Sequence, residues 1–141
     1  MTIVTYCLLI DDSCGGSWPV GVGAVTIDNF GVVDSVCVCC ERKTAEEIKL
    51  SVLQFLQKNW TEDAMLVIYG EDENRMLAEI QDTKFSSDRR FCLEKFLDGR
   101  TPENYCHVNG VFVPGDKDAP FVLCGAMAAA VAARYMLQRK N

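Results

Sequence analysis

Blocks of apolar residues separated by turn-forming residues predict three consecutive strands at the N-terminus. The run from Ile3 to Ile10 is apolar and β-branched, which is typical of a buried strand. The cluster DDSCGG follows it, and a second apolar run extends from Val20 to Ile27. The residues DNFG predict a hairpin turn before a third run from Val32 to Cys40. Because the connections are short, the three strands are expected to form an antiparallel meander.

A helical pattern begins after the third strand. Thr44 and Glu47 have the spacing of a capping box, in which Thr caps the helix and Glu bonds back to the cap. The apolar positions that follow recur at helical spacing: Ile48, Val52, Phe55 and Leu56. A fourth strand is predicted from Ala64 to Tyr69, and a second helix after Gly70. Since a helix connects them, the first and fourth strands are expected to be parallel.

The C-terminal part is harder to divide into elements. A short helix is expected from Asp88 to Leu97. A fifth strand is expected from Tyr105 to Val113, interrupted by Asn109-Gly110 and containing His107, the chain's one histidine.

The last helix has a clear start. Asp118 is a suitable N-cap and Pro120 suits the first turn, and the pattern continues to about Arg139. The order βββαβα(α)βα predicts an α/β fold: a mixed five-stranded sheet, three antiparallel strands followed by parallel ones, with helices on both faces. At 141 residues the chain has the usual size of one domain, so we expect residues 1–141 to form a single unit.

Hydropathy, cysteine content and net charge indicate the cellular environment in which the protein is expected. The apolar N-terminal run is too short to span a bilayer and lacks signal-peptide features, and the last helix is interpreted as a core helix, so no membrane association is expected. Among the eight cysteines, Cys37 and Cys40 have CxxC spacing, but they lie in the predicted strand CVCC, whose neighbouring side chains alternate between faces, and this disfavours a zinc site. Reduced, buried thiols are the expected state, as in an intracellular protein of the cytoplasm or nucleus. The net charge of −6 opposes non-specific binding to nucleic acid.

Four short motifs follow one another over residues 3–80. The first strand ends in IDDSCGG, the second contains GVGAV, the first helix opens with TAEE, and the fourth strand ends in IYGE. Each motif is weak alone. Their order and spacing together resemble the ribonuclease H superfamily, whose fold has the same order of elements.

The resemblance implies two-metal hydrolysis of a phosphodiester. Asp11, Glu47, Glu71 and Asp118 would be the metal ligands, with Asp116 as the alternative fourth acid. They would hold two Mg²⁺ or Mn²⁺ ions roughly 3.5–4 Å apart, one activating water and one stabilising the leaving oxygen. The substrate would be an RNA–DNA hybrid or a structured nucleic acid.

Each of these acids also has an ordinary structural interpretation. Asp11 suits the turn after the first strand, Glu47 completes a capping box, and Glu71 suits a helix start; Asp116 and Asp118 suit a turn and an N-cap. The superfamily has Asp where this chain has Glu71, and its mobile histidine near the last acid has no counterpart. Two alternatives therefore stand beside the nuclease: a catalytically lapsed relative that binds a protein partner or its own copy, and an unrelated α/β module.

A further alternative is a relative of the DEDD-type 3′–5′ exonucleases, whose fold is related. Residues 66–77 resemble one of that family's motifs. Its first motif would need an acid at Ser13, and Gly125-Ala126 stands where the family has Asp-Ala. The match to an active exonuclease is therefore poor.

Overall fold

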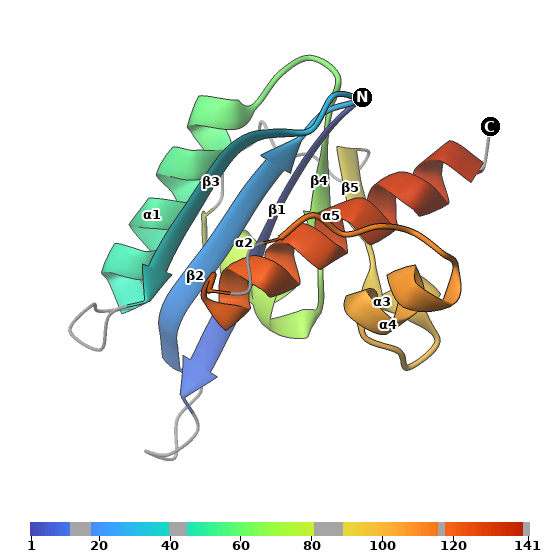
Figure 1. The fold of residues 1–141 in the computed structure, drawn as a ribbon. Coiled ribbons are helices and arrows are strands. Elements are labelled where there is room, and N and C mark those ends of the chain that lie inside the picture. The colour runs from blue at the N-terminus through green and yellow to red at the C-terminus, as the bar shows by residue number, and fades with distance from the viewer. Residues whose placement is uncertain (12–17, 40–44, 81–88, 116–117, 140–141) are drawn as a thin grey trace.

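Five strands form one mixed sheet in the order β3-β2-β1-β4-β5 (Figure 1). The computed structural model describes residues 1–11, 18–39, 45–80, 89–115 and 118–139. The strands are β1 (Thr2–Asp11), β2 (Trp18–Ile27), β3 (Val32–Cys39), β4 (Ala64–Ile68) and β5 (Arg90–Cys92). β2 is antiparallel to β1 and β3, whereas β4 is parallel to β1 and β5. The predicted mixed sheet, with an antiparallel part followed by a parallel part, is confirmed.

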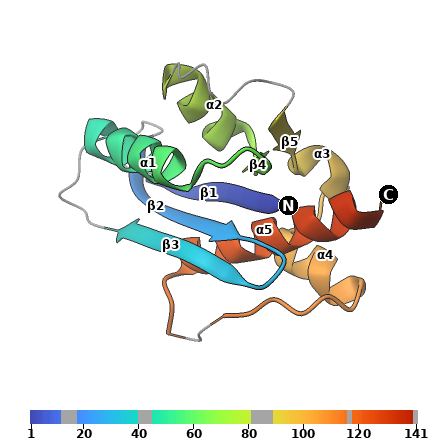
Figure 2. The same ribbon diagram turned by 90° about the horizontal axis from the view of Figure 1, so that it is seen from above.

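Helices cover both faces of the sheet (Figure 2). α1 (Ala45–Asn59) and α2 (Glu71–Ile80) lie on one face, and α5 (Phe121–Arg139) with α4 (Pro102–Val108) lies on the other. A short helix, α3 (Glu94–Leu97), follows β5. Alternate residues of β1 supply the two cores, because neighbouring side chains of a strand point to opposite faces. Val4 and Tyr6 pack toward α1 and α2, and Ile3 and Cys7 pack toward α5.

The central part of α5 is rich in alanine and lies close to the sheet. At its first turn the contact is backbone to backbone: a Cβ on Gly23 of β2 would lie 2.6 Å from the carbonyl group of Val122. By length and composition α5 could also cross a membrane, but half of that apolar window is buried inside the fold. This burial agrees with the interpretation of α5 as a core helix.

The predicted fifth strand from Tyr105 to Val113 is wrong. Residues 102–108 form α4, and the fifth strand is the three-residue β5, which lies within the range predicted as a short helix. α4 starts with a standard signal: Thr101 is the N-cap, its Oγ1 accepts a hydrogen bond from Asn104 N at 3.1 Å, and Pro102 occupies the first turn. The prediction of a strand relied on the aromatic and β-branched residues from Tyr105 onward and overlooked this helix start. As a consequence His107, expected inside a strand, is exposed in the last turn of α4.

Candidate functional site

One edge of the sheet collects most of the positions that the sequence suggested for a site. β1, β3 and β4 run in the same direction and end at this edge, and α1, α2 and α5 begin there (Figure 1). In open α/β sheets, ligands bind outside the carboxyl ends of parallel strands. This edge, called the carboxyl edge below, is therefore the first place to look for a function.

Two of the predicted ligands can be placed only in part. Asp11 is the last residue of β1, where its backbone pairs with Trp18, and its side chain lies outside the described part of the structure. The pairing of β1 with β4 ends earlier, at Tyr6 and Ile68, so Asp11 belongs to a part of β1 that extends beyond β4 (Figure 1). Asp116 lies outside the described residues, as does Thr44, the predicted partner of the capping box.

The other three predicted ligands lie on the surface. The side chain of Glu71 is 87% exposed, and its Oε1 lies 3.7 Å from Nη2 of Arg75, one turn along α2. Glu47 is exposed in the first turn of α1, and Asp118 is exposed ahead of α5. Within the described ranges, no group of three or more His, Cys, Asp or Glu side chains is placed to hold a metal ion.

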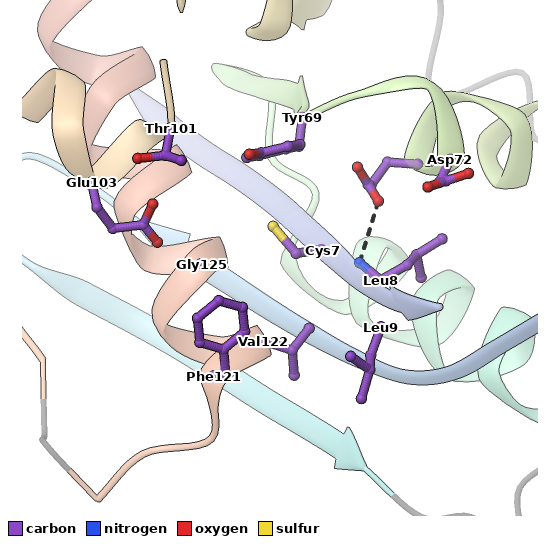
Figure 3. Close-up of a pocket in the computed structure, with 11 residues that line it drawn as sticks. Cys7, Leu8, Leu9, Tyr69, Asp72, Thr101, Glu103, Phe121, Val122 and Gly125 are labelled. Carbon is purple, nitrogen blue, oxygen red and sulfur yellow. Dashed lines mark hydrogen bonds between the residues drawn. The ribbon is translucent and has the colours of Figure 1, made fainter. Parts of the chain in front are cut away.

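A hollow of about 270 Å³ opens at the same edge, between β1, α2, α4 and α5 (Figure 3). We refer to it below as the edge hollow. Its wall combines apolar side chains with a thiol, two hydroxyls and three carboxyl groups: Cys7, Leu8, Leu9, Tyr69, Asp72, Glu73, Thr101, Glu103, Phe121, Val122 and Gly125. None of these residues was among the predicted ligands.

Glu73 is the buried acid of the edge hollow. Its side chain is only 5% exposed, and its Oε2 accepts a hydrogen bond from Leu8 N at 3.3 Å. The hydroxyl of Tyr6, on the opposite side of β1 from Cys7, donates to the backbone carbonyl of Glu73. Burial raises the pKa of Glu73 to about 7, although the hydrogen bond from Leu8 acts in the opposite direction. At neutral pH this carboxyl is therefore partly protonated.

Cys7 faces the edge hollow from the middle of β1. Its side chain is 9% exposed, and Sγ points into the space that Tyr69 and Glu103 also face (Figure 3). Burial raises the pKa of the thiol strongly, and the negative charges of Glu73 and Glu103 raise it further. A thiol that stays protonated at neutral pH is a poor nucleophile and a poor metal ligand. Cys7 therefore contributes a small, weakly polar wall rather than a reactive group.

Gly125 of α5 lies across the edge hollow from Cys7. A Cβ built on this glycine would lie 4.0 Å from Sγ of Cys7, which is an ordinary van der Waals contact. The resemblance to the DEDD exonucleases would place an acid at this position. Because residue 125 is a glycine in this chain, the facing positions on β1 and α5 offer a thiol and a residue without a side chain.

Few features of the sequence indicate this hollow. Cys7 sits inside an apolar strand and Gly125 inside an apolar helix, where both look like packing residues. Glu73 is the third acid of a helix start, a position that usually faces solvent. The one usable signal was Thr101-Pro102, which marks a helix start and would have placed Glu103 in a first turn.

Comparison of the sequence with models of known protein families and with curated proteins found no match. The geometry of the carboxyl edge is therefore the basis for inferring a function.

Proposed function

We propose that this chain is a ribonuclease H-like domain that acts by binding a partner rather than by hydrolysing a phosphodiester. The order of elements and the strand order β3-β2-β1-β4-β5 support the relationship, together with the four motifs over residues 3–80. The acidic chain, with its net charge of −6, also favours a partner other than nucleic acid.

One observation carries the proposal. The wall of the edge hollow presents Cys7 and Gly125 face to face, while the acids expected to bind metal, as far as their side chains are described, are exposed and form no group that could hold a metal ion. Two-metal hydrolysis needs several carboxylates around ions only about 3.5–4 Å apart. A hollow with a buried carboxyl, hydroxyls and an apolar wall is instead typical of a binding pocket.

The second candidate is the metal-dependent nuclease, and one observation favours it. The topology brings Asp11 and the starts of α1, α2 and α5 to one edge. In that case Asp11, Glu47, Glu71 and Asp116 or Asp118 would hold two Mg²⁺ or Mn²⁺ ions, and nucleic acid would be the substrate. Side-chain movement of exposed acids such as Glu71 would be needed to bring them together.

A cleavage assay separates the two candidates. The purified chain is incubated with Mn²⁺ or Mg²⁺ and labelled RNA–DNA hybrid, duplex, branched and single-stranded substrates, beside Asp11→Asn as the matched control. The proposed function predicts that the wild type cleaves no faster than Asp11→Asn. Metal-dependent cleavage that is lost in Asp11→Asn would overturn it and establish the nuclease, because that substitution removes a carboxylate ligand while keeping the size of the side chain.

A further inference from the structure

Three polar groups reach the edge hollow without a hydrogen-bond partner or ion pair among the described residues. They are the carboxylate of Glu103, the hydroxyl of Tyr69 and the thiol of Cys7 (Figure 3). The thiol is nine-tenths buried, so water outside the hollow cannot easily satisfy it. Glu103 is exposed and Tyr69 is half-buried, so solvent hydrates them in the empty hollow, and a ligand can replace that solvent at both groups.

The charge around the edge hollow has one sign. Asp72 and Glu103 contribute carboxylates to its wall beside the partly protonated Glu73, and no basic side chain among the described residues lines it. The charge of Asp72 is partly offset by Arg75, whose Nη2 lies 3.6 Å from Oδ1. The field of Glu103 reaches the neighbouring groups, since it contributes to the raised pKa values of both Cys7 and Tyr69. A cation is the charge that complements this space.

The rest of the wall is apolar and partly open. Phe121 is 86% exposed at the start of α5, and Leu9 is 43% exposed at the end of β1. A guanidinium group suits such a mixed wall, because it is planar, weakly hydrated, stacks on aromatic rings and donates two parallel hydrogen bonds to a carboxylate.

We propose that the edge hollow binds the guanidinium group of an arginine side chain presented by a protein partner. Glu103 would accept its hydrogen bonds, Tyr69 would position it, and Phe121 would lie against its face. The volume of about 270 Å³ is slightly below the ~300–1,000 Å³ of pockets for drug-sized ligands, and thus suits one side chain. The exposed Phe121 and Leu9 would be covered by the surface around that arginine. This inference rests on the proposed function, because it names the partner chemistry of the same edge.

The test uses the full ¹⁵N-labelled chain and nuclear magnetic resonance. N-acetylarginine amide is the probe for an arginine residue, N-acetylcitrulline amide is its neutral isostere, and agmatine represents a small free guanidinium compound. We expect saturable shifts of the Leu8, Thr101 and Gly125 amides with N-acetylarginine amide in the millimolar range, and none with the citrulline compound. Glu103→Gln should weaken binding about tenfold, because it removes a charged hydrogen-bond acceptor. Glu62→Gln removes the same charge from an exposed site before β4 and should leave binding unchanged.

Three results would overturn the inference. They are no saturable shift with N-acetylarginine amide, an equal response to the citrulline compound, or binding of agmatine alone, which would make the ligand a small amine rather than a protein. Absence of binding together with absence of cleavage removes this inference and leaves the proposed function standing. Metal-dependent cleavage that is lost in Asp11→Asn removes the proposed function, whatever the titration gives.

Discussion

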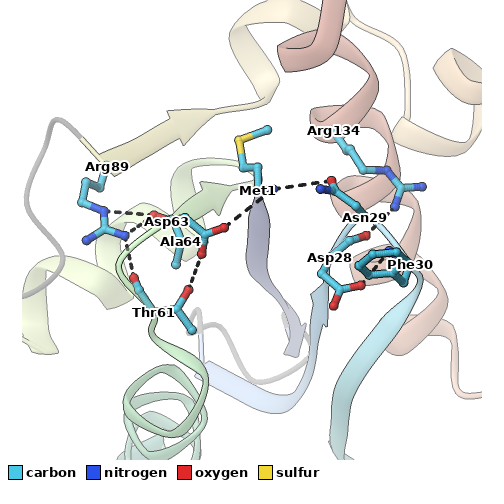
Figure 4. Close-up of polar contacts among 9 residues, drawn as sticks. All are labelled: Met1, Asp28, Asn29, Phe30, Thr61, Asp63, Ala64, Arg89 and Arg134. Atoms are coloured by element: carbon cyan, nitrogen blue, oxygen red, sulfur yellow. Dashed lines mark hydrogen bonds and ion pairs between the residues drawn. The ribbon is translucent and has the colours of Figure 1, made fainter.

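The polar groups at the two ends of β1 and β4 differ in whether they have hydrogen-bond partners within the chain. At the amino end, polar side chains have partners within the chain (Figure 4). The N-terminal ammonium group lies 3.7 Å from Oδ2 of Asp63 and donates to Oδ1 of Asn29 at 3.4 Å. Arg134 of α5 donates to the carbonyl of Asp28 at 3.0 Å, which ties the last helix to the turn between β2 and β3.

Arg89 also has partners within the chain at the amino end. Its guanidinium group donates to Thr61 O at 2.6 Å and to Ala64 O at 2.8 Å, and it lies 4.6 Å from the centre of the Trp60 ring. At the carboxyl end, by contrast, Glu103, Tyr69 and Cys7 face the edge hollow without such partners among the described residues. The polar groups at the amino end stabilise the fold, and the groups without partners at the carboxyl end are those that the proposed binding function uses.

The largest expected effect is at Gly23, where the first turn of α5 packs against β2 beside the edge hollow. Gly23→Ala would place a methyl group 2.6 Å from backbone atoms of Val122, which cannot rotate away. We expect a loss of about 3 kcal/mol in the free energy of unfolding, measured by urea denaturation. Gly125→Ala is the matched control: its added Cβ makes only an ordinary contact with Cys7, and alanine favours a helix, so we expect a gain of up to about 1 kcal/mol. Equal losses of stability in both variants would contradict the close packing of α5 against Gly23.

The next effect is a pH dependence caused by Glu73. Its pKa is about 7 in the folded chain against an ordinary value of 4.5, so between these values the folded chain binds more protons than the unfolded chain. Stability should therefore fall as pH rises through this window, by on the order of 3 kcal/mol.

Glu73→Gln removes this effect while keeping an acceptor for Leu8 N. The variant should be little different from wild type at about pH 5 and more stable at about pH 8, as measured by urea denaturation at both values. Glu79→Gln, an exposed substitution in the same helix, should follow the wild-type curve. A constant difference between Glu73→Gln and wild type at both pH values would show that Glu73 does not titrate in this range.

A smaller effect is expected at the amino end. Arg89→Ala removes charge-assisted hydrogen bonds to two carbonyls and the contact with Trp60, which should cost about 2 kcal/mol. Arg100→Ala, an exposed arginine beyond α3, should change stability by less than about 0.5 kcal/mol. Thermal or urea unfolding compares the two variants, and a similar result for both would remove the contrast between the ends.

The smallest effect on stability is expected for Glu103→Gln in the edge hollow. Because Glu103 is exposed and has no ion pair among the described residues, the change in unfolding free energy should be within about 0.5 kcal/mol of zero. Urea midpoints measured beside those of Arg89→Ala check this. A loss comparable with that of Arg89→Ala would mean that Glu103 stabilises the fold and is not kept for a ligand.

The sequence predicted the strands with regular patterns and missed the short ones. The predicted bounds of β1 to β4 agree with the structure to within two residues, because apolar and β-branched residues dominate these strands. β5 has three residues, and pairing with β4 rather than local propensity makes it a strand. The segment from Tyr105 has aromatic and β-branched residues, yet Thr101 and Pro102 start a helix there.

For the candidate site, the sequence indicated the edge of the sheet at which the hollow lies, but not the residues that line the hollow. Asp11 and Glu71 pointed to the carboxyl edge because the ends of β1 and β4 are recognisable. The wall depends on how α4 and α5 pack over β1, which brings Glu103 and Gly125 beside Cys7. No local pattern encodes this tertiary contact, and Glu73 becomes buried for the same reason.

The most direct test of the central claim is a calorimetric titration of the wild-type chain and Asp11→Asn with Mn²⁺, which needs no choice of substrate. Binding through the edge hollow without hydrolysis predicts no saturable Mn²⁺ uptake that depends on Asp11. Uptake of two ions by the wild type that is lost in Asp11→Asn would show that the carboxylates converge on a metal centre, and would contradict the account.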